Sequence, residues 1–275
     1  MVLIPTFSDD YGPWALLTGA SSGIGAEFVR QLAPSGLKLI LVARRKERMQ
    51  QLSHEVENKY GTEVKIIATD LANESGWQHV VSECENLEIG LLINNAGMQT
   101  HGSFFRDPVA KHLDIVKLNS SAVVALTHAF GSKMVRRKKG GIIITSSISS
   151  TPIPWVATYC ASKSFASTFG RSIREELLQY GVGLTVLEPA IVTSEMSAEV
   201  QKTVDMSSGA FPEQPVEECV SEALDAFMRG RPKIIPGLRN RLQVGVMRSL
   251  PEALQMRLLN ADMERAMDEE VKKSS

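Results

Sequence analysis

Short apolar runs alternate with longer helix-like stretches along most of this 275-residue chain, and this alternation limits the folds open to it. The runs are rich in Ile, Leu and Val and lack polar alternation, which is typical of strands buried on both faces. Strands are expected at 14–18, 38–43, 64–69, 90–94, 141–146, 183–188 and 233–235. Helices are expected between them, for example at 24–32, 46–59 and 162–180. This order predicts an α/β fold in which right-handed crossovers build a doubly wound parallel sheet of about seven strands.

Composition points to one domain and argues against nucleic acid as a partner. No internal repeat, low-complexity tract or linker divides the chain, so residues 1–275 are expected to form a single domain. The formal net charge of -1 argues against a nucleic-acid-binding surface. The basic run at 136–139 is explained by a helix end, where cations meet the negative end of the helix dipole.

The cysteines and the N-terminus indicate where the protein works. Cys84, Cys160 and Cys219 are odd in number and widely spaced, so they form no metal-ligand or redox pattern and suggest a reducing compartment. Residues 1–14 do not resemble a secretory signal, and no apolar run is long enough for a transmembrane helix. A cytoplasmic protein without a metal site is expected.

A glycine-rich turn follows the first expected strand and opens the first expected helix. It contains Gly19, Ser21, Ser22, Gly23, Ile24 and Gly25. Glycines let a pyrophosphate approach the backbone, and a helix N-terminus supplies free amides and a positive dipole end. An ordinary turn between strand and helix is the alternative, but the strand-turn-helix context favours a dinucleotide site.

Two arginines follow the second expected strand, where NAD-binding folds usually carry an acidic residue. A guanidinium offers forked donors to a phosphate, so Arg44, assisted by Arg45 or Ser21, indicates NADP(H). A solvated charge cluster at a helix start is the alternative. After the third strand, Asp70, followed by Leu71, is expected either to accept from the adenine amino group or to cap a helix.

The candidate acid/base pair is Tyr159 and Lys163, four residues apart on an expected helix and therefore on one face. A cation beside a phenol lowers the phenol pKa from about 10, which would make Tyr159 a proton donor and acceptor. Ser146 is expected to orient a substrate oxygen beside them. Asn119 interrupts an apolar helical stretch, where a buried amide needs partners.

These motifs, in this order, resemble the short-chain dehydrogenase/reductase family, of the type that prefers NADP. The likeness covers roughly residues 14–194, and the step of thirteen residues from Ser146 to Tyr159 also fits it. Ser147 is the alternative for the serine of this motif, but the spacing favours Ser146. The resemblance implies a Rossmann-type fold, with Tyr159 as general acid/base, Ser146 on the reacting oxygen, and Lys163 on the nicotinamide ribose. The resemblance also implies that Asn119 positions a water molecule, which links Asn119 to Lys163. The residues expected to hold the cofactor are Gly19, Ser21, Ser22, Gly23, Ile24, Gly25, Arg44, Arg45, Asp70, Leu71, Asn95, Ala96, Gly97, Tyr159, Lys163, Pro189, Ile191, Val192 and Ser194.

One departure from the family pattern follows the sixth expected strand, where Ala190 replaces a common glycine and restricts the local backbone. Beyond it, the resemblance makes an irregular stretch at about 195–212 a substrate lid, with Met196, Met206 and Phe211 available to face a ligand. Ser146, Tyr159 and Met196 are the expected substrate contacts. Apolar core packing would select the same residue types as an apolar substrate.

A C-terminal extension at about 237–271 contains two helix-like stretches broken at Pro251, with arginines interleaved among apolar residues. Packing against the domain or a second subunit is favoured over contact with a membrane surface. The extension and the overall layout are loosely similar to reductases of long-chain 3-oxoacyl groups and 17-ketosteroids. The family resemblance also implies a homodimer or homotetramer, through the helices that precede and carry Tyr159.

The sequence thus predicts an NADP(H)-dependent oxidoreductase that acts on an apolar carbonyl or alcohol. A catalytically silent NADP(H)-binding sensor or scaffold is the alternative from another class, although such a protein needs no acid/base pair. A nucleotide-sugar epimerase would share Tyr159 and Lys163, but it would normally need a larger C-terminal substrate region.

Overall fold

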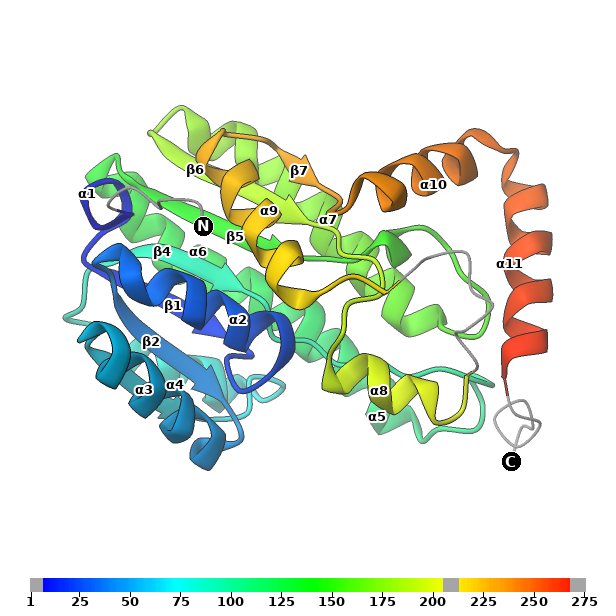
Figure 1. The fold of residues 1–275 in the computed structure, drawn as a ribbon, viewed down its shortest axis with the longest axis horizontal. Coiled ribbons are helices and arrows are strands. Elements are labelled where there is room, and N and C mark those ends of the chain that lie inside the picture. Colours follow the sequence, from blue (N-terminus) through cyan, green and yellow to red (C-terminus); the bar gives the residue numbers. More distant parts are fainter. Residues whose placement is uncertain (1–6, 205–212, 268–275) are drawn as a thin grey trace.

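One parallel sheet organises the protein, whose computed structural model describes residues 7–204 and 213–267 (Figure 1). Its seven strands lie in the order β3-β2-β1-β4-β5-β6-β7. They are β1 (Trp14–Thr18), β2 (Lys38–Ala43), β3 (Val64–Ala68), β4 (Ile89–Asn94), β5 (Gly140–Thr145), β6 (Val182–Leu187) and β7 (Lys233–Ile234), and every pair is parallel. The predicted fold is confirmed, with each strand within a residue of its expected bounds.

Helices cover both faces of the sheet. One face carries α1 (Phe7–Tyr11), α2 (Gly23–Leu32), α3 (Lys46–Tyr60) and α9 (Val216–Met228), and the other carries α4 (Glu74–Glu83), α6 (Ala122–Arg137) and α7 (Ala157–Leu178). Successive residues of β1 enter opposite cores, because side chains alternate along a strand: Leu17 joins the first core and Leu16 the second. Both leucines are fully buried, and each contributes about 1.5–3 kcal/mol of burial free energy.

The sequence order of the strands reverses between β1 and β4, whose carboxyl ends border the crevice that such sheets use for ligands. Short segments surround this edge: α5 (Val109–Val116), the π-helical turn η2 (Lys117–Ser121), the 3-10 turn η3 (Ile148–Ser150) and α8 (Glu195–Gln201). A further 3-10 turn, η1 (Ala33–Ser35), lies at the opposite end of α2. Short helices and turns therefore surround the carboxyl edge of the sheet, where such folds bind ligands, whereas longer helices cover its two faces.

The basic run ends a helix, as expected. Helix α6 stops at Arg137, and Lys138 adopts a left-handed conformation before β5. The guanidinium of Arg137 donates to the carbonyl of Ile89 at 2.7 Å, so this part of the run helps to hold the end of a neighbouring strand.

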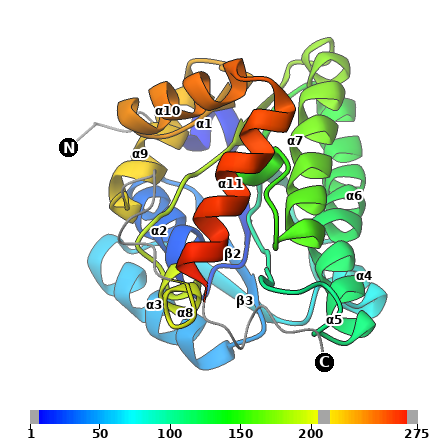
Figure 2. The ribbon, with the colours of Figure 1, turned by 90° about the vertical axis from the view of Figure 1, so that its right-hand side faces the viewer.

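The C-terminal extension forms α10 (Leu238–Ser249) and α11 (Glu252–Ala266), which are separated at Pro251 as predicted. Helix α10 is fixed to the domain by charge: the buried carboxylate of Glu188 lies 3.3 Å from Arg248 and 3.5 Å from Lys233. Helix α11 crosses the side of the molecule toward which the strands point (Figure 2). In the described part of the chain, no helix combines the length and apolarity needed to span a membrane.

Three free cysteines are distributed through the packed interior. Cys84 belongs to the core beneath α4 and α6, and Cys219 to the core beneath α9. Cys160 lies on α7, next to Tyr159. Burial raises the thiol pKa to about 11 for Cys84 and Cys160 and to about 12 for Cys219.

Candidate active site

The glycine turn is attached directly to the end of the neighbouring strand. The hydroxyl of Thr18 donates to the carbonyl of Ile93 at 3.2 Å and accepts from the amides of Asn95 and Ala96 at 2.9 and 3.0 Å. Since Asn95 also donates from its side chain to the carbonyl of Thr18, the ends of β1 and β4 form one rigid unit. The segments expected to contact the cofactor are thus brought together.

Two glycines of this turn are required by close contacts. Gly19 has a φ of 68°, and a Cβ there would lie 2.8 Å from Cα of Ala96. A Cβ on Gly25 would lie 2.1 Å from the carbonyl oxygen of Gly19. Ser22, at the N-cap of α2, makes no side-chain capping hydrogen bond, so the amides of the first helical turn remain open to an anion. These features fit the pyrophosphate of a dinucleotide.

The two arginines after β2 differ in their surroundings. Arg45 donates to Ser22 at 2.6 Å, to Ser21 at 3.1 and 3.2 Å, and to Glu195 at 2.7 Å. Arg44 is exposed and makes no hydrogen bond or ion pair with any described residue. The free guanidinium of Arg44 fits a 2′-phosphate, whereas Arg45 holds the glycine turn and the first residue of α8.

Glu195 is a residue of this edge that the sequence analysis missed. Its carboxylate pairs with both Arg45 and Arg48, and these contacts lower its pKa. The pair joins positions 150 residues apart, so no local pattern indicates it.

The structure separates the two interpretations of Asp70. The N-cap of α4 is Asn73, so the prediction that Asp70 caps this helix is wrong. Instead, Asp70 Oδ1 accepts from the amide of Ala72 at 3.0 Å within a tight turn. Leu71 is buried in the core. The contact of Asp70 with an adenine stays a prediction.

Asn119 has a full set of partners. It lies in the π-helical turn η2, a distortion that is frequent at functional sites. Its amide nitrogen donates to the carbonyl of Met98 and to the hydroxyl of Ser162, both at 2.9 Å, and its oxygen accepts from the amide of Met98 at 3.0 Å. Asn119 therefore fixes the segment after Gly97 against helix α7, and its link to a water stays a prediction.

Tyr159 and Lys163 lie on the same face of α7, as their spacing predicts. The ammonium of Lys163 is 5.8 Å from the centre of the Tyr159 ring, and it donates to the carbonyl of Thr145 at 2.9 Å. A Cβ on Gly97 would lie 3.2 Å from this ammonium, so the end of β4 borders the pair. The acid/base candidates and the glycine turn share one edge of the sheet.

The pKa of Tyr159 differs from the expectation. Burial raises it to about 12, and a hydrogen bond with Ser147 opposes the rise only in part. The prediction that Lys163 lowers the pKa of Tyr159 is wrong for the protein without a bound cofactor. The ammonium of Lys163 donates to the carbonyl of Thr145, and burial disfavours its charged form. Burial lowers the pKa of Lys163 to about 8. Tyr159 is therefore a protonated phenol, suited to donate its proton.

The serine beside Tyr159 is Ser147 and not Ser146, which corrects the expectation from spacing. Ser146 is 1% exposed, and its hydroxyl donates to the carbonyl of Lys163 at 2.7 Å. Side chains alternate along β5, so Ser146 faces helix α7 together with Ile144. Ser147 leaves on the other side and interacts with the phenol of Tyr159. Counting alternation along the strand, and not only back from Tyr159, would have indicated Ser147.

The chain after β6 returns across the same edge. The carbonyl of Pro189 accepts from Ile148 at 3.0 Å, and Ile191 and Val192 pair with Gln214. Ala190 is not strained: the only described non-glycine residues with positive φ are Lys138 and Trp155. Ala190 therefore adopts its place in this turn without left-handed backbone strain, and the effect of the alanine on cofactor binding stays open.

The expected lid is more regular than its sequence suggests. Its first part is the helix α8, which Ser194 and Ser197 begin with a reciprocal capping box. Ser194 lies against the glycine turn, because a Cβ on Gly23 would be 3.2 Å from Cβ of Ser194. Met196 is 41% exposed, while the expected lid residues Met206 and Phe211 lie outside the described residues.

A doubly wound sheet with a glycine turn at its switch point and a Tyr–Lys pair at the same edge defines a class of dinucleotide-dependent oxidoreductases. A sequence model of the short chain dehydrogenase family matches residues 13–205. The chain therefore belongs to the short chain dehydrogenase family, whose members act on hydroxyl and carbonyl groups with a nicotinamide cofactor.

Relatives with assigned activities agree with this placement. The 17-beta-hydroxysteroid dehydrogenase type 3 of Rattus norvegicus is 33% identical over 208 residues, which cover 73% of this chain and 68% of the relative. The very-long-chain 3-oxoacyl-CoA reductase of Homo sapiens is 32% identical over 204 residues, covering 72% of this chain and 65% of the relative. A short-chain dehydrogenase from Sphingobium yanoikuyae, solved in complex with NADPH, superposes with a TM-score of 0.75 at 28% identity, covering 88% of this chain and 98% of that one.

Proposed function

We propose that this protein reduces an apolar ketone or aldehyde with NADPH, or oxidises the corresponding alcohol. The observation that carries the proposal is the protonated phenol of Tyr159 beside the hydroxyl of Ser147, with the ammonium of Lys163 on the same helical face. A phenol, a second hydroxyl and a cation at the mouth of a dinucleotide site are what proton-coupled reduction of a carbonyl requires.

The nicotinamide supplies the hydride when it is bound, and the protein supplies orientation and the proton. Tyr159 donates its proton to the carbonyl oxygen as negative charge develops there. Ser147 donates a hydrogen bond to the same oxygen and thereby orients it. Lys163 stabilises charge beside the phenol and offers donors to a ribose. Asn119 maintains this arrangement by fixing the loop after β4 against α7.

The preference for NADPH rests on Arg44. Its guanidinium is exposed and unpaired among the described residues, at the strand end where an acidic residue would select NAD. The relative from Sphingobium yanoikuyae, which was solved with NADPH, supports the same choice. Arg45 contributes to either cofactor because it holds the glycine turn through Ser21 and Ser22.

Two relatives and the lining of a nearby pocket support the proposed substrate class. The relatives are named for a hydroxysteroid and for a very-long-chain 3-oxoacyl thioester, which share a carbonyl or hydroxyl on a large apolar body. A pocket at the start of α7, the helix that carries Tyr159, is lined by Trp155, Val156 and Phe104 among others. An apolar ketone fits both observations, with residues 195–212 as its lid and Met196 at its border.

The assembly and the location stay proposals as well. Apolar side chains are exposed on the helices that precede and carry Tyr159, among them Leu113, Val116 and Phe165. We propose that a homodimer or homotetramer forms through these helices, and that the three buried free cysteines reflect a reducing, cytoplasmic environment.

The direct test follows NADPH consumption by the purified protein with a panel of aliphatic ketones, 3-oxoacyl thioesters, 17-ketosteroids and aldehydes. Turnover of apolar ketones that disappears in Tyr159→Phe is expected. The Tyr159→Phe variant with unchanged NADPH binding is the matched control, because it separates chemistry from cofactor loss. NADPH binding without turnover of any carbonyl would contradict the proposal.

A further inference from the structure

Trp155 has an unusual backbone conformation for a bulky residue. Its φ is 69°, in the left-handed region that side chains with a Cβ avoid. Such conformations persist only where the surroundings hold them, and they concentrate at ligand clamps and active sites. Trp155 lies four residues before Tyr159, in the segment that leads into α7.

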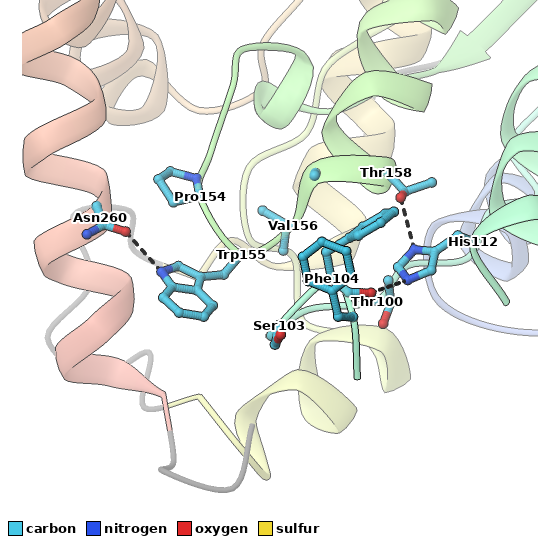
Figure 3. A pocket seen from close by; sticks show the side chains of 12 residues that line it. Thr100, Ser103, Phe104, His112, Pro154, Trp155, Val156, Thr158 and Asn260 are labelled. Carbon is cyan, nitrogen blue, oxygen red and sulfur yellow. Dashed lines mark hydrogen bonds between the residues drawn. The ribbon is translucent and has the colours of Figure 1, made fainter. Parts of the chain in front are cut away.

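Three separate segments hold Trp155 in place. Its carbonyl accepts from the amide of Gly102 at 2.8 Å, which ties it to the loop after β4. Its indole Nε1 donates to Oδ1 of Asn260 on α11 at 3.0 Å (Figure 3). Its ring packs against an apolar cluster of Val200, Val204 and Met267, which joins the end of α8 to the end of α11.

Helix α11 is itself positioned for this contact. The amide nitrogen of Asn260 donates to Glu264 at 2.8 Å, which fixes the amide so that its oxygen faces the indole. Val204 and Met267 also form an antiparallel bridge, so the lid segment and α11 are joined through their backbones. The family model matches residues 13–205, so α11 lies outside the region that the model covers.

A pocket of about 290 Å³ opens between Trp155 and the loop after β4 (Figure 3). Phe104 and Val156 supply apolar wall, and Thr158 lies directly before Tyr159 in the chain. His112 is buried and bonds both the hydroxyl of Thr158 at 2.9 Å and the carbonyl of Phe104 at 3.0 Å. The inner wall is therefore rigid, and Trp155 with Asn260 forms the wall on the side of α11.

We propose that this pocket receives the part of the substrate remote from its carbonyl, and that Trp155, locked by Asn260, sets how long that part can be. The inference rests on the proposed carbonyl reduction at Tyr159. Whole ligands occupy cavities of roughly 300–1,000 Å³, so a pocket of this size fits one end of a molecule. A straight apolar chain suits its aromatic wall, and the length limit would lie where the chain meets the indole.

Methyl ketones of increasing length, from butanone to tridecan-2-one, test the proposal with NADPH saturating. Each methylene that the pocket buries is expected to raise kcat/KM about fourfold, until the chain reaches Trp155 and the gain stops. Asn260→Leu frees the indole, so ketones beyond the limit of the wild type should show KM values lowered about tenfold. NADPH affinity should not change, and any effect on butanone, which is too short to reach Trp155, should be smaller than the effect on the long ketones.

The matched control is Arg257→Ala, on an exposed position of the same helix. A second test variant is Trp155→Phe, which keeps an aromatic wall without the N–H donor. Arg257→Ala should keep the length limit of the wild type. Trp155→Phe should lose it, and the Trp155→Phe/Asn260→Leu double variant should behave like either single variant, because both remove one hydrogen bond. Length profiles that are identical in wild type, Asn260→Leu and Trp155→Phe would overturn the inference.

A readout independent of turnover separates this inference from the proposed function. Undecan-2-one in the pocket should change the fluorescence of Trp155, and the change should be absent in Trp155→Phe, which retains Trp14 and Trp77. If no ketone is reduced but this signal is present, the reductase proposal fails and the pocket stands. If ketones are reduced without any Trp155-dependent signal, the pocket assignment fails and the reductase stands.

Discussion

The cofactor edge and the proposed substrate mouth, which is the pocket between Trp155 and the loop after β4, are built in different ways. At the cofactor edge, main-chain atoms in contact fix the geometry: Gly19 against Ala96, and Gly25 against Gly19. At the substrate mouth, side chains from separate segments meet at Trp155. A backbone site tolerates few substitutions, whereas a site made of side chains changes with each of them.

The difference suggests how one fold keeps its chemistry while its substrate changes. The glycine turn, the ends of β1 and β4 beside it, and α7 with Tyr159 and Lys163 all lie inside the region that matches the family. Helix α11, which contributes Asn260 to the mouth, lies outside it. Variants of the two regions should therefore affect different kinetic quantities.

The largest effect is expected from Tyr159→Phe, which tests whether the chemistry can be separated from the cofactor edge. Loss of the general acid should lower kcat about a thousandfold. Cofactor affinity, measured by NADPH fluorescence titration, should stay within about twofold, since the main-chain contacts of the turn are untouched. A kcat close to that of the wild type would remove Tyr159 from the mechanism.

The two neighbouring serines provide the next test. Ser147→Ala should lower kcat about a hundredfold, because a donor to the developing oxyanion is lost. Ser146→Ala removes a buried hydrogen bond to the carbonyl of Lys163. It should therefore lower the free energy of unfolding by about 1–3 kcal/mol and change kcat less than Ser147→Ala does. Steady-state kinetics together with thermal unfolding distinguish the pair, and the reverse pattern would return the catalytic role to Ser146.

The arginines after β2 sharpen the description of the cofactor edge. Arg44→Ala should weaken NADPH binding about tenfold and leave NADH binding unchanged, because it removes one charged donor to a 2′-phosphate. Arg45→Ala should weaken both cofactors alike, since it loosens Ser21 and Ser22. Dissociation constants for both cofactors decide the point, and an equal loss in Arg44→Ala would reject the 2′-phosphate assignment.

The smallest effect concerns pH. Lys163 is charged below its pKa of about 8 and loses its charge as the pH rises through that value, while Tyr159, with a pKa of about 12, stays protonated. The kcat/KM for reduction should therefore fall about fourfold between pH 7 and pH 8.5. Lys163→Arg keeps its charge, so its residual activity should lack this decline. If kcat/KM still falls over this pH range in Lys163→Arg, the titrating group is not Lys163.

The fold was predictable because its strands are buried on both faces. Residues such as Leu16 and Leu17 enter opposite cores, which produces continuous apolar runs that sequence analysis detects directly. Helix α8 was not predicted, because its polar, irregular sequence becomes helical through a capping box between Ser194 and Ser197. That device depends on hydroxyl positions and not on hydrophobic period.

The site was predictable where spacing along one helix decides it, as for Tyr159 and Lys163. It was not predictable where the backbone direction or a distant contact decides. Ser146 and Ser147 differ only in the face of β5 from which they leave. Trp155 and Asn260 are 105 residues apart, and their hydrogen bond follows from how α11 crosses the carboxyl edge. The sign of the Tyr159 pKa shift depends on burial, which a sequence does not report.

The buried thiols give this protein an internal probe of its own opening. Alkylating reagents react with thiolates, and all three cysteines are enclosed with raised pKa values, so labelling requires local unfolding. Cys84 reports on the layer under α4, Cys160 on the start of α7 and Cys219 on α9. Because the three thiols lie beside or within different helices, the order in which they become labelled would show which part of the molecule unfolds locally first, without introducing a single mutation.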